Sequence, residues 1–373
     1  MDQEPVRLAT SRSTIGVADL LAGMNCKLWG ATALMTQPDP ILRLPIIEMP
    51  ALDAGAVERR RVAGRLDAAC KEFGFFYLTG HGVPGQEVAS LMAASRRFFA
   101  TPLDRKLAIH MSKGGRAWRG YFPVGEELTS GRPDGKEGLY FGVELDDADA
   151  RVRAGRPLHG RNLFPATPGL RDAVLAYIDQ LTRLGHRLMS LLALGLGLDE
   201  DFFRAHYTQD PTVLFRIFNY PRTADADSGW GVGEHTDYGF ITLLKQDDVG
   251  GLQVRHGEQW LEAPDVPDSF VCNVGDMLER LTRGRYVSAL HRVRSSTARE
   301  RLSMALFFDP GFDAILNPIE GVHPDRDQPH TRVRWDDIDP HTVPGTYGEY
   351  LLSKVGRVFP DLRDDALSRE VRD

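Results

Sequence analysis

Two histidines and an aspartate have the side-chain types and the spacing of a metal site. His235 and Asp237 are two residues apart, and His291 follows in the strand-like run Ala289-Leu-His-Arg-Val293. Two imidazoles and one carboxylate can hold three positions on one face of an octahedral ferrous ion, which leaves three positions open. If His235 and Asp237 share a strand, both point to the same side of it. These residues therefore predict an Fe(II) centre that activates oxygen.

A His-x-Asp triplet alone is weak evidence, because this chain contains similar patterns elsewhere. His323-Pro-Asp325 has the same pattern, and His256-Gly-Glu258 comes close to it. The triplet at His235 differs because it opens a run to Leu244 that is typical of a turn leading into a strand. After His323, the third ligand would have to be His330 or His341, and neither lies in a strand-like run.

An arginine near the last histidine indicates a second function for the same site. Arg301 is followed by Leu302, Ser303 and Met304, and this alternation predicts that Arg301 and Ser303 face inward on one strand. A guanidinium can hold a carboxylate through two parallel hydrogen bonds, and Ser303 can add a third. Such an anchor beside a ferrous ion suits a dicarboxylate that also chelates the metal.

The elements that position these residues fall into a helical part and a strand-rich part. Asp53 is the expected N-cap of a first helix, Phe75–Leu78 is expected to form a short strand, and a further helical pattern runs through residues 88–99. Residues 113–145 are rich in glycine and predict loops with short strands.

The clearest helix is expected to begin with Thr167 as N-cap and Pro168 at its first position, and to end near Gly195 and Gly197. One buried stripe is formed by Leu170, Val174, Ile178, Leu181, Leu184, Leu188 and Leu191.

The period then changes to that of strands. The expected strands are Val213–Tyr220, Phe240–Leu244, Leu252–Arg255, Ser269–Val274, Tyr286–Val293 and Leu302–Phe308. Short strands without intervening helices favour a barrel or jelly roll. A last helical pattern, Tyr347–Val355, is expected to pack on the outside of that core.

The predicted organisation has four parts. Residues 1–40 lack periodicity and predict a disordered extension, or a segment upstream of a true start at Met35. Residues 41–165 form an N-terminal region, residues 166–320 form the β-rich core with its supporting helix, and residues 321–373 form a C-terminal tail. The fold class is thus mixed α/β with a mainly β core.

The charge, the apolar runs and the cysteines of the chain argue against several kinds of binding partner and cellular location. The formal net charge of −7 argues against a nucleic acid or an anionic membrane. No apolar run is long enough to span a bilayer, and no secretory signal is recognisable at the N-terminus. Cys26, Cys70 and Cys272 match neither a disulfide framework nor a zinc site. We therefore expect a cytoplasmic protein, whose oligomeric state the sequence leaves open.

Taken together, the motifs resemble those of the isopenicillin N synthase-like branch of the ferrous, 2-oxoglutarate-dependent oxygenases. The resemblance covers about residues 44–355. Its core motifs are His235-Thr-Asp237, His291-Arg-Val293, Arg301-Leu-Ser303 and Phe218-Asn-Tyr-Pro221, with weaker support from Phe73-Gly-Phe-Phe, Gly80-His-Gly82, Arg119-Gly-Tyr121 and Asn273-Val-Gly-Asp276.

The resemblance implies a double-stranded β-helix that binds Fe(II), 2-oxoglutarate and oxygen. Arg301 and Ser303 would bind the distal carboxylate of 2-oxoglutarate, and Tyr220 and Asn219 would help to orient this co-substrate. The co-substrate would leave as succinate and carbon dioxide while a C–H bond of a small molecule is oxidised. Hydroxylation is the default outcome, and desaturation and ring closure occur in the same family.

The substrate itself is not readable from the sequence. Aromatic side chains at Tyr121, Phe122 and Phe307 are candidates for lining its pocket, although ordinary core packing would use the same residue types. The segment Ser130–Glu137 is faintly similar to a phosphate loop, but its glycine spacing fails, and we expect a solvated loop there.

Two other functions remain open at this level. An iron oxidase that needs no 2-oxoglutarate could use Arg301 for its own substrate's carboxylate. A non-catalytic β-barrel protein could keep the site as a ligand pocket. An intact metal set together with an intact anchor argues against the second of these.

Overall fold

The strands of the described chain form two sheets that face each other. The structure is a computed structural model, and it describes residues 42–223, 230–296, 298–324 and 334–361. The expectations for residues 1–40, both the disordered extension and the start at Met35, lie outside these ranges. From Leu42 onward the chain forms one compact unit.

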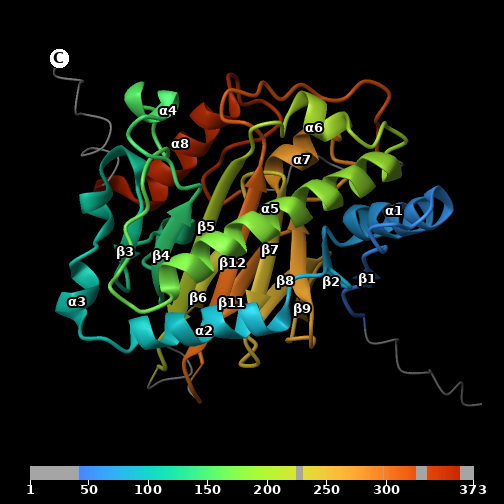
Figure 1. Ribbon diagram of the computed structural model, residues 1–373. Helices are drawn as coiled ribbons and strands as arrows, with labels where there is room; N and C mark the ends of the chain where they lie inside the picture. The colour runs from blue at the N-terminus through green and yellow to red at the C-terminus, as the bar shows by residue number, and fades with distance from the viewer. Residues whose placement is uncertain (1–41, 224–229, 297, 325–333, 362–373) are drawn as a thin grey trace, which may run out of the picture. The chain divides into compact units, whose positions relative to one another are not determined.

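The larger sheet has eight strands and the smaller has four (Figure 1). The larger sheet is ordered β1 (Ile46–Glu48), β2 (Phe75–Thr79), β10 (Phe270–Val274), β7 (Ile241–Gln246), β12 (Arg301–Asp309), β5 (Thr212–Tyr220), β4 (Glu137–Gly142) and β3 (Gly120–Phe122). The smaller sheet is ordered β6 (Trp230–His235), β11 (His291–Arg294), β8 (Leu252–His256) and β9 (Gln259–Glu262). All neighbours are antiparallel except β1 and β2. The predicted jelly roll is confirmed.

Helices pack against the larger sheet and connect its strands. They are α1 (Ala56–Glu72), α2 (Gly85–Phe99), α3 (Leu103–Leu107), α4 (Ala150–Arg153), α5 (Leu170–Gly195), α6 (Phe202–His206), α7 (Asp276–Leu281) and α8 (Tyr347–Val358), with short 3-10 turns η1 (Met111–Ala117) and η2 (Thr129–Gly131). Figure 1 shows α5 lying along the larger sheet, with α2 beside it. Among the described helices, none has the length and apolar character needed to cross a membrane.

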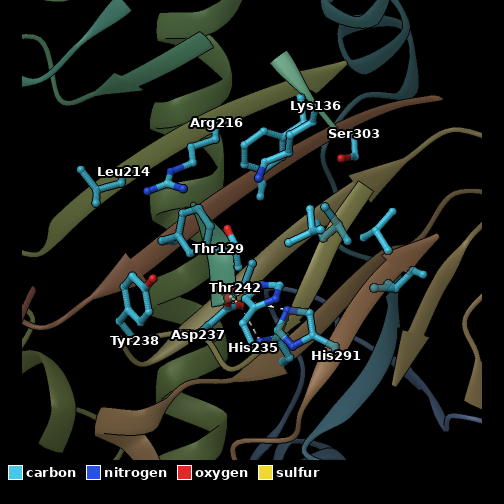
Figure 2. Close-up of a pocket in the computed structure, with 18 of the residues that line it drawn as sticks. Thr129, Lys136, Leu214, Arg216, His235, Asp237, Tyr238, Thr242, His291 and Ser303 are labelled. Carbon is cyan, nitrogen blue, oxygen red and sulfur yellow. Dashed lines mark hydrogen bonds and ion pairs between the residues drawn. The ribbon is translucent and has the colours of Figure 1, made fainter. Parts of the chain in front are cut away.

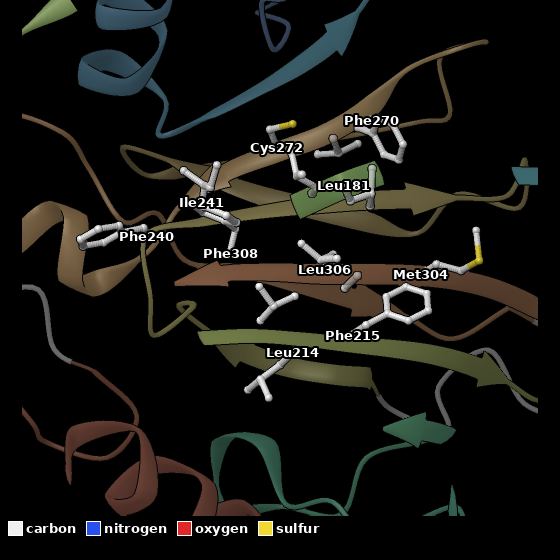
Figure 3. Close-up of a cluster of buried hydrophobic side chains, with 14 of the residues drawn as sticks. Leu181, Leu214, Phe215, Phe240, Ile241, Phe270, Cys272, Met304, Leu306 and Phe308 are labelled. Atoms are coloured by element: carbon white, nitrogen blue, oxygen red, sulfur yellow. The ribbon is translucent and has the colours of Figure 1, made fainter. Parts of the chain in front are cut away.

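Strand β12 has one face in the hydrophobic core beneath α5 and the other face in a pocket between the two sheets. Its even-numbered apolar residues pack in the cluster beneath α5 that Figure 3 shows, whereas Arg301, Ser303, Ala305, Phe307 and Asp309 line a pocket on the opposite face. This arrangement follows from the two-residue period of a strand. The buried members of the cluster include Leu181 from α5 and Met304, Leu306 and Phe308 from β12.

Helix α5 packs tightly against this sheet at Gly185. A Cβ atom built there would lie 2.5 Å from the Phe308 ring. We expect Gly185→Ala to lower the free energy of unfolding by about 1–3 kcal/mol, because overpacking forces the helix or the ring to move. Urea unfolding would measure the change. Gly64→Ala in α1 is the matched control, since nothing lies within 4 Å of its added Cβ, and it should stabilise slightly. Equal effects in both variants would contradict this account.

The predicted helix starts were wrong by two residues. Helix α5 has Gly169 as its N-cap with a φ of 76°, a left-handed conformation that glycine adopts readily, so Thr167 and Pro168 belong to the preceding turn. Helix α1 begins after an extended Gly55, and Asp53 lies in a turn before it. The predicted apolar stripe of α5 is confirmed, because its seven residues are all buried.

Two strand predictions also differ from the structure. The strand expected over Tyr286–Val293 begins only at His291, because residues 282–284 form a turn after α7 and the backbone N–H of Val287 donates to the carbonyl oxygen of Cys70. Strand β6, which ends at His235, was not predicted. His235 therefore ends one strand instead of opening the next.

Candidate active site

The three predicted metal ligands come together at the end of the smaller sheet. His235 is the last residue of β6, His291 is the first residue of β11, and the two are paired across the sheet. Asp237 lies in the turn that leads to β7, so its approach to His235 does not come from alternation along one strand. One ligand atom from each residue lies within 4.8 Å of the others (Figure 2).

Backbone contacts turn both imidazoles toward the aspartate. The Nδ1 atom of His235 lies 2.8 Å from the carbonyl oxygen of Gly233, and that of His291 lies 3.2 Å from the carbonyl oxygen of Ala289. A carbonyl oxygen accepts only, so Nδ1 donates and the lone pair is left on Nε2. The Nε2 atoms of His235 and His291 lie 3.9 and 3.7 Å from Oδ1 of Asp237.

The electrostatics of these residues suit a cation. Burial, together with the neighbouring His291, lowers the pKa of His235 to about 3, so its imidazole is neutral at physiological pH. Burial by itself would raise the pKa of Asp237, but the two histidines and two hydrogen bonds outweigh it and hold the pKa below its usual value. Two imidazoles that present Nε2 and an ionised carboxylate form a donor set that fits one ferrous ion.

Neighbouring polar side chains fix the aspartate. Oδ2 of Asp237 accepts hydrogen bonds from Nδ2 of Asn273, at 2.7 Å, and from Oγ1 of Thr242. Both donors come from adjacent strands, β10 and β7, where Asn273 and Thr242 are paired in register. With Oδ2 held in this way, Oδ1 is the oxygen that faces the imidazoles.

Removing one of these supports should weaken metal binding. We expect Asn273→Ala to lower the affinity for Fe(II) by roughly 10- to 100-fold, the usual effect of losing a group that orients a metal ligand. Anaerobic titration of the metal-free protein with Fe(II) would measure it. Asn317→Ala, at an exposed position, is the control and should bind as the wild type does. An unchanged affinity in the Asn273 variant would show that Asp237 needs no such support.

Arg301 and Ser303 lie on β12 and line the same pocket as the three metal-site residues. Both are buried, and Nη1 of Arg301 lies 3.2 Å from Oγ of Ser303. The guanidinium also donates to Oε1 of Gln246 and to the carbonyl oxygen of Gly250. It lies 4.8 Å from the ring centre of Tyr220, its partner across the strand pair. The arginine is thereby held rigidly, as recognition of a carboxylate requires.

The other predicted residues divide between pocket and core. Phe307 and Tyr220 line the pocket. Asn219 points to the other face of β5, where its Nδ2 donates to Oε1 of Glu137 at 3.0 Å. The Tyr121 hydroxyl donates to the same carboxylate. The Phe122 ring packs against Phe218 and Phe359. Asn219, Tyr121 and Phe122 are therefore not part of the pocket wall.

Sequence reasoning missed a charged group in the pocket wall. Lys136, Glu127 and Arg216 line the pocket and are all buried. The solvated loop predicted for residues 130–137 is therefore wrong at its C-terminal end, where Asp134, Lys136 and Glu137 are buried. One sequence signal could have placed Arg216 in the pocket. Leu214, Arg216 and Phe218 are two residues apart on β5, so they share one face of the strand, and all three line the pocket.

Comparison with known proteins agrees with this geometry. Residues 44–167 match the family model for the N-terminal part of the non-haem dioxygenase in morphine synthesis, and residues 200–310 match the 2OG-Fe(II) oxygenase superfamily. The two matched segments together carry α1, α2 and most strands of both sheets.

Individual relatives cover nearly the whole described chain. A "probable iron/ascorbate oxidoreductase" of Dictyostelium discoideum is 44% identical over 354 residues, which is 88% of this chain and 98% of the relative. A 1-aminocyclopropane-1-carboxylate oxidase of the same organism is 35% identical over 364 residues, which is 86% of this chain and 96% of that protein. A full-length protein of Neurospora crassa, solved in complex with alpha-KG and thymine, is 25% identical with a TM-score of 0.70 over 86% of this chain and 98% of that one.

The match to the 2OG-Fe(II) oxygenase superfamily and the neighbour solved with alpha-KG favour the dioxygenase over the oxidase and the non-catalytic barrel that the sequence left open. The chain belongs to the isopenicillin N synthase-like branch of the 2-oxoglutarate/Fe(II) oxygenase superfamily, and it is an oxygen-using dioxygenase that depends on Fe(II) and 2-oxoglutarate.

Proposed function

We propose that this dioxygenase hydroxylates an unactivated C–H bond of a small molecule, with succinate and carbon dioxide as co-products. His235, Asp237 and His291 hold the iron, and Arg301 with Ser303 holds 2-oxoglutarate. The observation that carries the proposal is that the donor set at the end of the smaller sheet and the arginine from the larger sheet line one pocket. Desaturation and ring closure would use the same site.

The bound iron, with 2-oxoglutarate, supplies the oxidising power of the reaction. The residues of this chain supply position and exclusion. Arg301 and Ser303 fix the distal carboxylate of the co-substrate, so that its keto-acid end is directed toward the donor set. Tyr220 packs against the guanidinium and limits its motion. Asn273 and Thr242 hold the carboxylate of Asp237 in place.

Apolar walls keep bulk water out of the site. Phe75, Val232, Leu244, Leu252 and Val293 line the pocket around the donor set. The ring of Phe75 packs edge-on against the ring of His291, with centroids 5.1 Å apart. Such exclusion protects the reaction from unproductive side reactions with water.

A small molecule is the proposed substrate because of the relatives' names and the position of the pocket. The similar proteins are named for 1-aminocyclopropane-1-carboxylate or solved with thymine, and both compounds are small. The pocket is lined by residues of both sheets and by Leu351 of α8.

The test is an anaerobic titration of metal-free protein with Fe(II) and then with 2-oxoglutarate. A weak visible charge-transfer band should appear when the co-substrate chelates the iron. On admission of oxygen, succinate should form in step with one oxidised product from a panel of small molecules. Iron binding without the band would move the oxidase mechanism ahead, and no iron binding would refute the assignment of the three ligands.

A further inference from the structure

A second group of buried charges lines the pocket, apart from the metal ligands and the co-substrate anchor. Glu127 and Lys136 are 2% exposed, and Arg216 is 8% exposed. Glu127 and Lys136 come from the loop around η2, and Arg216 comes from β5. Figure 2 shows Lys136 and Arg216 among the side chains of the pocket that also holds the triad.

One carboxylate is shared between the two cations. Oε2 of Glu127 lies 2.9 Å from Nζ of Lys136, and Oε1 lies 2.5 Å from Nη1 of Arg216. Lys136 has a further acidic partner in Asp134. Arg216 has instead the neutral hydroxyl of Tyr140, 3.1 Å from Nη2.

Arg216 also keeps an unused donor. Its buried Nε atom has no hydrogen-bond partner among the described residues. A buried guanidinium N–H without an acceptor is costly, and native proteins normally pair such groups. Aromatic rings of Tyr140 and Phe307 lie 4.3 and 5.5 Å from the guanidinium carbon and fix its plane.

The acids of this cluster are unevenly divided, because Glu127 is shared by both cations and Asp134 pairs with Lys136. Burial would raise the pKa of Glu127, but Lys136 and Arg216 outweigh it, so Glu127 is ionised. Burial raises the pKa of Asp134 despite the nearby lysine. Both oxygens of Glu127 lie within ion-pair distance of a cation, Oε2 near Lys136 and Oε1 near Arg216.

We propose that Arg216 binds a carboxylate of the prime substrate, so that this dioxygenase acts on small organic acids. The inference rests on the proposed function, because it assigns a substrate class to the same pocket. The substrate's carboxylate accepts from the unpaired Nε–H and places an anion beside Arg216, which shares the carboxylate of Glu127 with Lys136. Arg216 is then the specificity-determining residue, distinct from Arg301, which binds the co-substrate.

A simple acid and its neutral isostere test this assignment. Propionate and propionamide are compared by ligand-observed NMR, on protein loaded anaerobically with Fe(II) and saturating 2-oxoglutarate so that Arg301 is occupied. The wild type should bind propionate at least roughly tenfold more tightly than propionamide, the usual gain from a charge-assisted hydrogen bond. Arg216→Gln should remove this preference.

A second variant guards against misfolding, because it is expected to change affinity in the opposite direction. Glu127→Gln removes the competing anion and should tighten propionate binding by roughly threefold or more. Arg294→Gln, at an exposed arginine paired with Glu262, is the matched control and should leave both affinities unchanged. If Arg216→Gln does not fold, the Glu127 variant alone decides.

The outcomes separate this inference from the proposed function. If the charge-transfer band never forms in wild-type protein, the proposed function has failed. If the band forms but propionate shows no saturable binding, or keeps its preference in Arg216→Gln, the inference is overturned while the dioxygenase assignment stands. Unchanged or weaker propionate binding in Glu127→Gln also overturns it.

Discussion

Asp237→Ala should abolish turnover, with succinate formation falling by at least roughly a thousandfold. The carboxylate is the only anion in the proposed ligand set, and losing a ligand that holds and orients the metal removes several kcal/mol of stabilisation from the reaction. The variant should also fail to form the charge-transfer band with 2-oxoglutarate. Succinate release under saturating Fe(II) and the anaerobic spectrum would measure the two effects.

The matched control for this substitution is Asp248→Ala. Asp248 is an exposed aspartate that pairs with Arg299 and is not among the residues lining the pocket, so its loss should leave turnover unchanged. If Asp237→Ala retained the band and a substantial rate of succinate formation, another residue would have to complete the metal site. A fold intact by circular dichroism is needed for either conclusion.

Arg301→Gln should raise the concentration of 2-oxoglutarate needed for half-maximal turnover by at least roughly a hundredfold. Two charge-assisted hydrogen bonds to the distal carboxylate would be lost, each contributing about 1.5–3 kcal/mol. Arg301→Lys keeps the charge but not the planar pair of donors, so it should lie between the wild type and the glutamine variant. Succinate formation as a function of 2-oxoglutarate concentration gives both values.

Arg301 also supports its surroundings, so stability must be followed in parallel. Its guanidinium donates to Gln246 and Gly250, and these acceptors lose their partner in the glutamine variant. A shift in the midpoint of thermal unfolding would report that loss separately. A wild-type requirement for 2-oxoglutarate in both Arg301 variants would show that the co-substrate binds elsewhere in the pocket.

The sequence predicted the chemistry of the site better than its local geometry. His235, Asp237 and His291 were found because few combinations of residue types can hold a ferrous ion, and the arginine followed from strand alternation. The placement of His235 and Asp237 on one strand was wrong. The end of β6 at His235 depends on pairing with His291 across the smaller sheet, a long-range contact that local pattern does not encode.

The charged wall of the pocket could not be predicted for a similar reason. The segment from Ser130 to Lys136 is polar and contains glycine and proline, which is typical of an exposed turn. Residues 131–133 are exposed as expected, but Asp134 and Lys136 are buried. The surrounding loop packs against β6, where Gly233 makes room for Ser130, and the backbone N–H of Leu128 donates to the carbonyl oxygen of Val358 in α8. Burial of Lys136 is thus a property of three distant segments.

Strand alternation and strand position explain which of the residues predicted to bind substrate or co-substrate line the pocket. Phe307 shares the inward face of β12 with Arg301 and Ser303. Asn219 is one residue away from the inward-facing Tyr220, so it points to the opposite face. Tyr121 and Phe122 lie on β3 at the edge of the larger sheet, separated from β12 by β4 and β5. Tyr121 and Phe122 therefore do not line the pocket because of the position of β3 in the sheet, which sequence alone does not give.

The two faces of β12 link catalytic competence to the folding transition. The same nine residues carry the co-substrate anchor on one side and the apolar cluster beneath α5 on the other. Strand β12 is paired with β5 over all nine residues and with β7 from Ser303 to Phe308. Local opening of this strand would expose the apolar cluster beneath α5 to water. We therefore expect local opening to require much the same free energy as global unfolding. On heating, the capacity to bind 2-oxoglutarate should therefore disappear in the same cooperative transition as the secondary structure, without an inactive folded intermediate.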